Sequence, residues 1–232
     1  MGNKSAAPGL LTVGSDRSPS RAREDYVKAI YQLGGGAPVR AAAVARYLNV
    51  SRVSVSKAKR LLETDGLLEA EAAPAKPLRL SRKGRALAVA MVRRHRLLET
   101  FLHRSLRVPL ERLHSEAERI EHVISDDLAM RIAAFLGRPI SDPHGHPIPY
   151  DDAPVAGSPL NRLASVAVGG RARVVSLDDR DDEAVGALAA AGVLPGTTVR
   201  VELSDEVKMR VRCGKRVVSL DRRHAEMVRI AT

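Results

Sequence analysis

The chain has 232 residues, enough for two or three domains that each bury a hydrophobic core. Its formal net charge is +11, and residues 40–96 alone hold 14 Lys and Arg against 4 Asp and Glu, which predicts a polyanionic partner for that segment. The single cysteine, Cys213, excludes an intrachain disulfide and a thiolate metal cluster, and indicates a cytoplasmic protein. No apolar run approaches eighteen residues, so no membrane partner is expected.

The first ninety residues show the pattern of a winged helix-turn-helix. Residues 1–20 are rich in Gly, Ser and Pro and predict a flexible leader. A helix is expected from about Ser20 to Leu33, with Tyr26, Ile30 and Leu33 on its apolar face. A short helix, a tight turn and a helix from about Arg52 to Thr64 follow, and `LLEAEAAPAKPLRLS` predicts two short strands around a loop. This order predicts a DNA-binding domain over residues 21–90.

The helix over 52–64 begins with hydroxyl and cationic side chains, which suit DNA phosphates and base edges. The alternative is a solvated amphipathic helix whose buried side holds Val53, Ala58, Leu61 and Leu62. The local positive charge favours DNA binding. The candidate contacts are Arg40, Ser51, Arg52, Ser54, Ser56, Lys57, Arg60 and Lys76.

The rest of the chain predicts a helical domain and then a β-rich one. Helices are expected over about 81–105 and 109–136, which gives a helical domain over 91–150. Proline-rich residues then form a connector, with a linker at 151–162. Valine alternates with polar residues over 163–232, which predicts a small β-barrel-like module. The expected fold is therefore mainly α with α+β parts.

The helix predicted over 109–136 carries a polar stripe that turns apolar at one end. At about 100° per residue, one stripe contains His114, Glu118, Glu121, His122 and Ser125, and then Ile132 and Leu136. A solvated face would not end in Ile and Leu, so the stripe is predicted to face inward. Several carboxylates that are removed from water need a cation, which is either a divalent metal or Arg or Lys from a neighbouring helix.

The preceding helix offers a second set of ligands. His95 and Glu99 lie one turn apart in `RRHRLLE`, and they could converge with His114 across a helix–helix contact. The alternative for the acids is ordinary pairing with Arg93, Arg94 or Arg96, in a regulator that senses a small organic ligand. An enzyme is not indicated, because the sequence lacks a nucleophile elbow, a phosphate loop and a zincin motif.

Several motifs together resemble one known family. In order they are `REDYVKAIYQL`, the helix-turn-helix, `RKGRALA`, `RRHRLLE`, `LHSEAERIEHVISDDL` and `DPHGHPIP`. From about Arg23 to Pro149 the chain resembles the diphtheria-toxin-repressor family of metal-dependent transcriptional regulators, especially its manganese-sensing members. More loosely, `AAAGVLPGTTVRV` resembles the SH3-like (ferrous-transport A) domain of the longer members.

The resemblance implies a metal-activated homodimer that binds palindromic operator DNA and represses manganese-uptake genes. It also implies that the helical domain is a dimerisation domain and that 163–232 is SH3-like. An apolar stripe suits either the dimer contact or the core within the chain: Leu113, Ala117, Ile120, Ile124 and Leu128. One implied metal site matches Asp25, Glu118, Glu121 and His122. The second matches His95, Glu99 and His114, with Asp181 supplied by the SH3-like domain.

Differences from the family predict the metal. Iron-sensing members have Met at the position of Asp25 and Cys at that of Glu118, so this chain offers a sulfur-free ligand set suited to Mn(II), with Fe(II) possible. Short manganese sensors have Glu where this chain has Lys28, so we expect one ion there and a separate second ion. Without metal, the carboxylates of Asp25, Glu118 and Glu121 are expected to repel one another and loosen the N-terminal helix.

Overall fold

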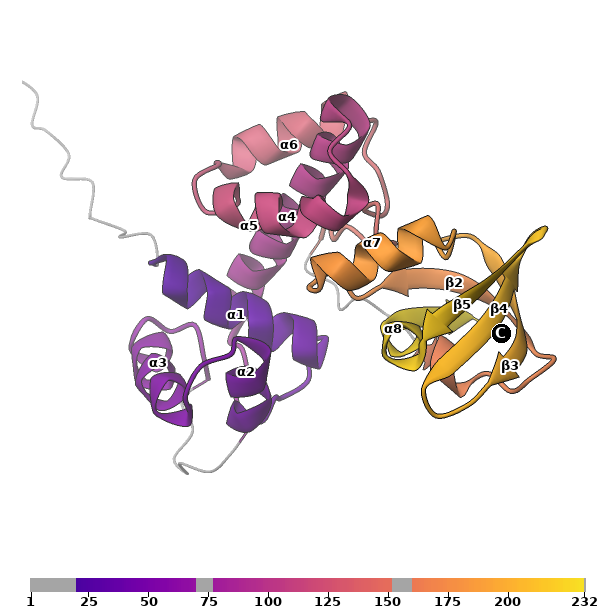
Figure 1. Ribbon diagram of the computed structural model, residues 1–232. Helices are drawn as coiled ribbons and strands as arrows, with labels where there is room; N and C mark the ends of the chain where they lie inside the picture. Colours follow the sequence, from indigo (N-terminus) through magenta and orange to yellow (C-terminus); the bar gives the residue numbers. More distant parts are fainter. Residues whose placement is uncertain (1–19, 70–76, 152–159, 232) are drawn as a thin grey trace, which may run out of the picture.

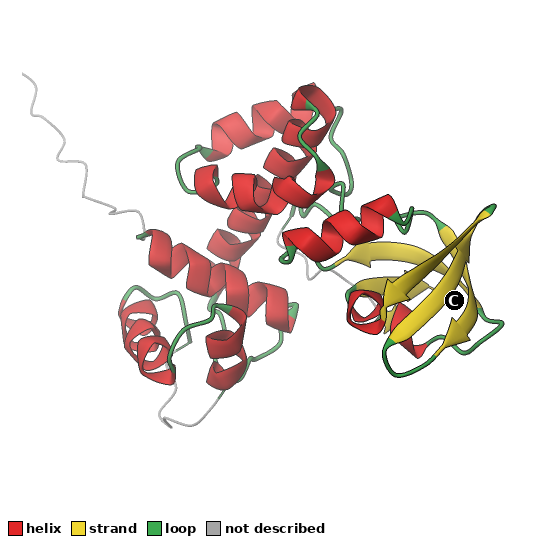
Figure 2. Ribbon diagram, viewed as in Figure 1, coloured by secondary structure: helices red, strands yellow, loops and turns green. Residues whose placement is uncertain are grey.

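The computed structural model describes residues 20–69, 77–151 and 160–231. Figure 1 shows three parts: a group of short helices at the N-terminal end, a helical part built around a long helix, and a sheet at the C-terminal end. The long helix α4 (Arg82–Leu106) starts among the N-terminal helices and runs into the helical part. Figure 2 shows that the strands gather in the C-terminal part. Among the described residues no helix combines the length and apolarity needed to cross a membrane.

The N-terminal part packs three helices around one core. They are α1 (Arg21–Gly34), α2 (Ala41–Tyr47) and α3 (Arg52–Thr64). The Ser51 hydroxyl accepts a hydrogen bond from the Ser54 amide and caps α3, as the hydroxyl-rich start of this helix favours. The expected apolar face of α1 is partly wrong, because Leu33 is 40% exposed whereas Val27 and Tyr31 are buried beside Ile30.

Two strand-like segments flank the part of the predicted wing that lies outside the described residues. Leu68 pairs with Leu80, and Leu78 pairs with Val39 ahead of α2, each as an isolated antiparallel bridge. The predicted hairpin is therefore represented, in the described residues, by single bridges. These bridges fix the base of the wing beside α2 and α3.

The helix predicted over 109–136 is wrong, because the chain forms several shorter helices there. They are the 3₁₀ turn η1 (Leu110–Arg112), α5 (Leu113–Ile120) and α6 (Asp126–Phe135). Ser125 starts a new helix, since its hydroxyl accepts a hydrogen bond from the Leu128 amide. Asp126 and Asp127 in the first turn of α6 suit the positive end of that helix. The stripe inferred from His114 to Leu136 is consequently not one helix face.

The C-terminal part contains, within the described residues, a six-stranded antiparallel sheet in the order β1-β6-β2-β3-β4-β5. Its elements are β1 (Asn161–Arg162), η2 (Leu163–Ser165), β2 (Arg171–Leu177), α7 (Asp182–Ala190), β3 (Thr198–Ser204), β4 (Lys208–Cys213), β5 (Arg216–Asp221), α8 (Arg222–Glu226) and β6 (Val228–Ala231). Leu110 and Leu113 of the helical part belong to the same hydrophobic cluster as the core of the sheet. The predicted fold class is confirmed, and this shared cluster fixes the position of the SH3-like part.

Gly84 marks the tightest contact between α4 and the segment after α3. A Cβ atom built there would lie 1.9 Å from the Leu67 carbonyl oxygen. Gly84→Ala should therefore destabilise the protein by about 1–3 kcal/mol, because the helix or the Leu67 backbone must move. The control Gly186→Ala in α7 meets only ordinary contacts and should stabilise it by about 0.5–1 kcal/mol. Urea unfolding measures both, and equal effects would contradict this packing.

Candidate metal centre

Imidazole and carboxylate groups gather where α1, α4, α5, the connector after α6 and the loop before α7 meet. Among the described residues, four sets of side chains bring ligand atoms within 4.8 Å of one another. The sets are Asp25, Glu121 and His122; His95, Glu118 and Glu121; His95, Glu99, His114 and Asp179; and Glu99, Asp142 and His144. None contains sulfur, and two of the sets cross between parts of the molecule, since Asp25 comes from the DNA-binding part and Asp179 from the SH3-like part.

The first set joins the DNA-binding part to the helical part. The His122 Nε2 atom lies 3.0 Å from Asp25 Oδ1 of α1 and 3.4 Å from Glu121 Oε1. On the other side of the ring, Nδ1 lies 2.7 Å from Glu24 Oε2. A carboxylate that accepts from Nδ1–H orients the ring and leaves Nε2 free to bind a metal. The sequence analysis missed Glu24. Its role differs from that of Asp25, because Glu24 supports the His122 ring from the Nδ1 side whereas Asp25 lies beside the free Nε2.

Glu118 is the predicted residue of this site that the structure leaves outside the first set. Its Oε1 lies 2.7 Å from the Lys28 ammonium, which also lies 2.7 Å from Glu121 Oε1. A lysine from α1 thus places a positive charge between two of the three acids that were expected to repel one another, Glu118 and Glu121. Arg94 and Arg96 pair with other acids, Asp126 and Asp142.

Glu121 and Lys28 each stabilise the charged form of the other. Burial raises the pKa of Glu121, but the His95 hydrogen bond and charge, with Lys28, outweigh burial and lower that pKa to about 2. Burial lowers the pKa of Lys28, but Glu121 and Glu118 outweigh it, and the net shift is upward. Both groups are therefore charged at neutral pH in the metal-free protein.

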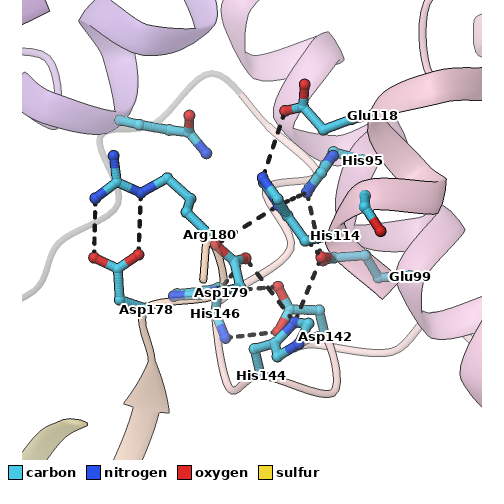
Figure 3. Close-up of polar contacts among 12 residues, drawn as sticks. His95, Glu99, His114, Glu118, Asp142, His144, His146, Asp178, Asp179 and Arg180 are labelled. Carbon is cyan, nitrogen blue, oxygen red and sulfur yellow. Dashed lines mark hydrogen bonds and ion pairs between the residues drawn. The ribbon is translucent and has the colours of Figure 1, made fainter. Parts of the chain in front are cut away.

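The second predicted site also converges, with one change of ligand. Figure 3 shows His95, Glu99 and His114 directed toward one another, with Asp179 beside them. The His95 Nε2 atom lies 3.2 Å from Glu99 Oε1 and 3.1 Å from His114 Nδ1. Asp179 Oδ1 lies 3.7 Å from His114 Nδ1. The SH3-like part thus contributes Asp179 to this set.

Asp181, the residue expected at that place, has another contact. Its side chain accepts a hydrogen bond from the Ala184 amide at 3.0 Å and caps α7. An Asp that precedes a helix by one position is a common N-cap, and this signal could have redirected the assignment from Asp181 to the acids before it. The four aspartates in `DDRDD`, two on each side of Arg180, are hard to separate by sequence alone, because a small shift of the loop exchanges one for another.

The connector supplies ligands that the sequence analysis did not select, although it noted the segment `DPHGHPIP`. His144 Nδ1 lies 3.4 Å from Glu99 Oε1, while its Nε2–H donates to the Leu110 carbonyl oxygen at 3.1 Å. That bond fixes the ring and aims Nδ1 at Glu99. The backbone holds the segment in place, since the Leu177 amide of β2 donates to the His144 carbonyl oxygen. Gly145 has φ +90°, and a Cβ atom there would lie 2.1 Å from the Val175 carbonyl oxygen.

Unpaired polar atoms test whether these sets fit a metal ion. Buried polar groups normally have hydrogen-bond partners. Among the described side chains, the buried atoms without such a partner include both Glu99 oxygens, Asp142 Oδ2, His122 Nε2 and His144 Nδ1. Each belongs to a set described above and is an atom that could ligate a metal ion. The residues present therefore fit a divalent cation.

The loop that carries Asp179 also contacts the DNA-binding part. The Arg180 guanidinium carbon lies 4.3 Å above the Tyr47 ring of α2, and Asp178 holds the guanidinium through two 3.0 Å hydrogen bonds. The Tyr47 hydroxyl donates to Gln32 of α1. A cation held over an aromatic face is an attractive contact. Asp179 and Arg180 thus connect the second set of ligands to α2.

Candidate DNA contacts lie on the open face of α3. Ser51, Arg52, Ser56, Lys57 and Arg60 are exposed, as is Arg40 ahead of α2, and Ser54 is half-buried. Lys76 lies outside the described residues. The predicted buried side of this helix was partly wrong: Val55, Ala58 and Leu62 are buried, whereas Val53 is 64% and Leu61 49% exposed.

The stability of the metal-free protein should depend on pH through His144. Burial lowers the pKa of His144, but the close contact of its ring with the Glu99 carboxylate, and the charges of nearby acids, outweigh burial and raise that pKa from 6.5 to about 9. A raised histidine pKa stabilises the fold fully below pH 6.5, and the contribution is lost as pH rises through 9. Urea unfolding in EDTA should therefore show a fall in the free energy of unfolding between these pH values. His144→Gln should reduce that fall, and an unchanged fall would contradict the assignment.

Sequence comparisons place this geometry among known proteins. Family models match residues 20–74 (iron dependent repressor, N-terminal DNA binding domain), 81–150 (iron dependent repressor, metal binding and dimerisation domain) and 161–232 (FeoA domain). The iron-dependent repressor IdeR of Mycobacterium leprae is 37% identical over 195 residues, which cover 78% of this chain and 84% of that protein. The diphtheria toxin repressor of Corynebacterium glutamicum is 35% identical, with 77% of this chain and 82% of that protein covered.

Similar solved structures come from the same kind of repressor. A manganese-dependent transcriptional repressor in complex with manganese is 33% identical, with a TM-score of 0.78 over 90% of this chain and 99% of that one. A crystal structure described as T. acidophilum IdeR is 29% identical, with a TM-score of 0.69 over 92% of this chain and 98% of that one. The chain therefore belongs to the diphtheria-toxin-repressor family of metal-dependent transcriptional repressors, a family of regulators and not of enzymes.

Proposed function

We propose that this protein is a cytoplasmic, Mn(II)-dependent repressor that binds palindromic operator DNA as a homodimer and controls manganese uptake. The observation that carries the proposal is the first set of ligands, because Asp25 lies on α1 of the DNA-binding part whereas Glu121 and His122 lie at the end of α5. An ion held there ties the orientation of the DNA-binding part to the metal level.

The ligand chemistry supports Mn(II). Carboxylates and imidazoles make up all four sets found among the described residues, and hard oxygen ligands suit Mn(II) better than the sulfur ligands preferred by softer metals. A similar solved structure is described as a manganese-dependent repressor with manganese. Fe(II) is the second candidate, because relatives of 37% identity are described as iron-dependent.

Operator recognition is assigned to α3. Its open face presents Arg52, Ser56, Lys57 and Arg60 next to the exposed Val53, which offers an apolar contact for a thymine methyl group. Two such helices in a two-fold dimer read the two halves of a palindrome. The proposed role of Arg40 and the wing residue Lys76 is phosphate contact.

Exposed apolar side chains of the helical part support the homodimer. Val123 is 80%, Phe135 72% and Ile140 85% exposed, and large apolar groups left in water commonly mark protein contacts. The apolar stripe that the sequence offered for either the dimer contact or the core is divided between the two. Leu113 and Ala117 are fully buried within the chain, whereas Leu128 is 44% exposed.

The chain's own residues explain how metal would act. A bound divalent ion supplies positive charge that the clustered carboxylates now receive from Lys28 and His95. Asp25, Glu121 and His122 would hold the ion, and Asp25 would thereby fix the position of α1 and of the attached α3. Metal would favour the DNA-competent arrangement through its differential affinity for that arrangement, and operator DNA would tighten metal binding by the same factor.

Glu121→Gln should abolish metal-dependent operator binding. The change removes one of the three ligands, so the operator affinity measured by fluorescence anisotropy in saturating Mn(II) should fall at least about tenfold. Glu116→Gln on the same helix is the control, because Glu116 contacts only Arg112 and Arg119 among the described residues. Equal and metal-independent binding by all three proteins would refute the proposal. Anaerobic titration with Fe(II) in place of Mn(II) decides the metal.

Phe135→Glu should dissociate the dimer. A charge on this 72% exposed ring would be buried without a partner in the proposed contact. Sedimentation velocity should show a shift from dimer to monomer. Val168→Glu on the SH3-like part, an apolar site that is also largely exposed at 60%, should leave the dimer intact. A monomeric wild type, or a dimeric Phe135→Glu, would exclude this surface as the dimer contact.

A further inference from the structure

Lys28 lies where an ion could bind. Its ammonium nitrogen lies 2.7 Å from Glu118 Oε1, 2.7 Å and 2.9 Å from the two oxygens of Glu121, and 3.4 Å from His95 Nδ1. These three partners are the set His95, Glu118 and Glu121, whose ligand atoms lie within 4.8 Å of one another. One ammonium thus contacts every member of a set that could otherwise hold a metal.

The surroundings of Lys28 make this contact strong. Its side chain is 6% exposed, and that of Glu121 is fully buried. Removal of one partner from a buried ion pair leaves an uncompensated charge, which is costly. The ammonium therefore neutralises Glu118 and Glu121 in the metal-free protein and connects α1 to α5 without any ion.

The same carboxylate is shared with the first set of ligands. Glu121 Oε1 contacts the Lys28 ammonium at 2.7 Å and lies 3.4 Å from His122 Nε2. An ion bound by Asp25, Glu121 and His122 must therefore share this oxygen with a fixed positive charge or displace it. Lys28 and Glu118 also line a cavity of about 510 Å³ with Asp25, so this place is open to ions.

We propose that Lys28 is an internal competitor for the sensed metal. This inference rests on the proposed function and adds to it that the lysine sets the metal concentration at which the sensor responds, while it closes the set of His95, Glu118 and Glu121 to a further ion. The lysine is a tuning residue of the sensor and not itself a ligand. Its charge weakens metal binding and stabilises the metal-free fold.

Lys28→Met tests the competition, because Met keeps the length of the side chain and removes its charge. Titration calorimetry with Mn(II) should show binding at least about tenfold tighter than in the wild type, or an additional ion per chain. The melting temperature of the metal-free protein should fall by roughly 10 °C. Damage to the fold alone would weaken metal binding, whereas the loss of a competitor strengthens it.

Two controls separate charge from other effects. Lys28→Arg keeps the charge and should bind Mn(II) much as the wild type does. Lys59→Met removes a lysine from α3 that pairs only with Glu63 among the described residues, so it should leave metal affinity unchanged. A gain in Lys59→Met equal to that in Lys28→Met would overturn the proposal, because net charge alone would then explain both.

The remaining outcomes are also decisive. If Lys28→Met shows neither tighter Mn(II) binding nor an additional ion per chain, the proposal is overturned. Should Lys28→Met unfold without metal, recovery of the fold in Mn(II) supports it, and failure of both Lys28→Met and Lys28→Gln to fold in saturating Mn(II) overturns it. Wild-type operator binding that ignores Mn(II) would instead refute the proposed function, so the two failures are distinguishable.

Discussion

The electrostatic requirement of buried carboxylates determines how the three parts of this molecule fit together. Glu99, Glu121 and Asp142 lie out of contact with water, and an ionised carboxylate in that setting needs a nearby cation. In the metal-free protein that role falls to Lys28 from α1 and to the imidazole of His95 from α4. Lys28, His95 and Glu121 come from different elements, so the contacts that neutralise Glu121 also fix α1 and α4 relative to α5.

The SH3-like part takes part in this arrangement through two different kinds of contact. Leu110 and Leu113 extend the hydrophobic core of the sheet into the helical part, which fixes the position of the domain. Asp179 and Arg180 then reach from one loop to the ligand cluster and to Tyr47 of α2. The apolar contact holds the SH3-like part against the helical part, and the polar loop connects it to the DNA-binding part.

Local sequence patterns predicted many of the helices and strands, whereas features that depend on contacts between distant segments could not be predicted. The helix over 52–64 was predicted with its correct ends, because a capping Ser51 and the terminal Gly66 are local signals. The interruption after Ile120 was missed although a local signal for it was present, because Ser125 followed by Asp126 and Asp127 is typical of a helix start. The inward position of Glu121 was inferred correctly from a continuous stripe that the fold does not contain.

Prediction of the candidate metal ligands was limited in the same way. Spacing placed His95 and Glu99 one helical turn apart and allowed His114 to converge with them, and the family resemblance assigned the three to one site. The role of Lys28 as a partner of Glu118 depends on how α1 approaches α5, which no local pattern records. The contribution of Asp179 depends on a loop shift of two residues, and that of His144 on the path of an irregular connector.

The positive charges built into the ligand cluster also bear on the lifetime of the protein. Many small metal-binding domains are unfolded without their ion, so a metal-starved cell degrades them. Here Lys28 and His95 already balance the acids, so we expect the metal-free chain to stay folded and to resist proteolysis. Existing molecules of the regulator would then persist through metal starvation and respond again when the metal returns.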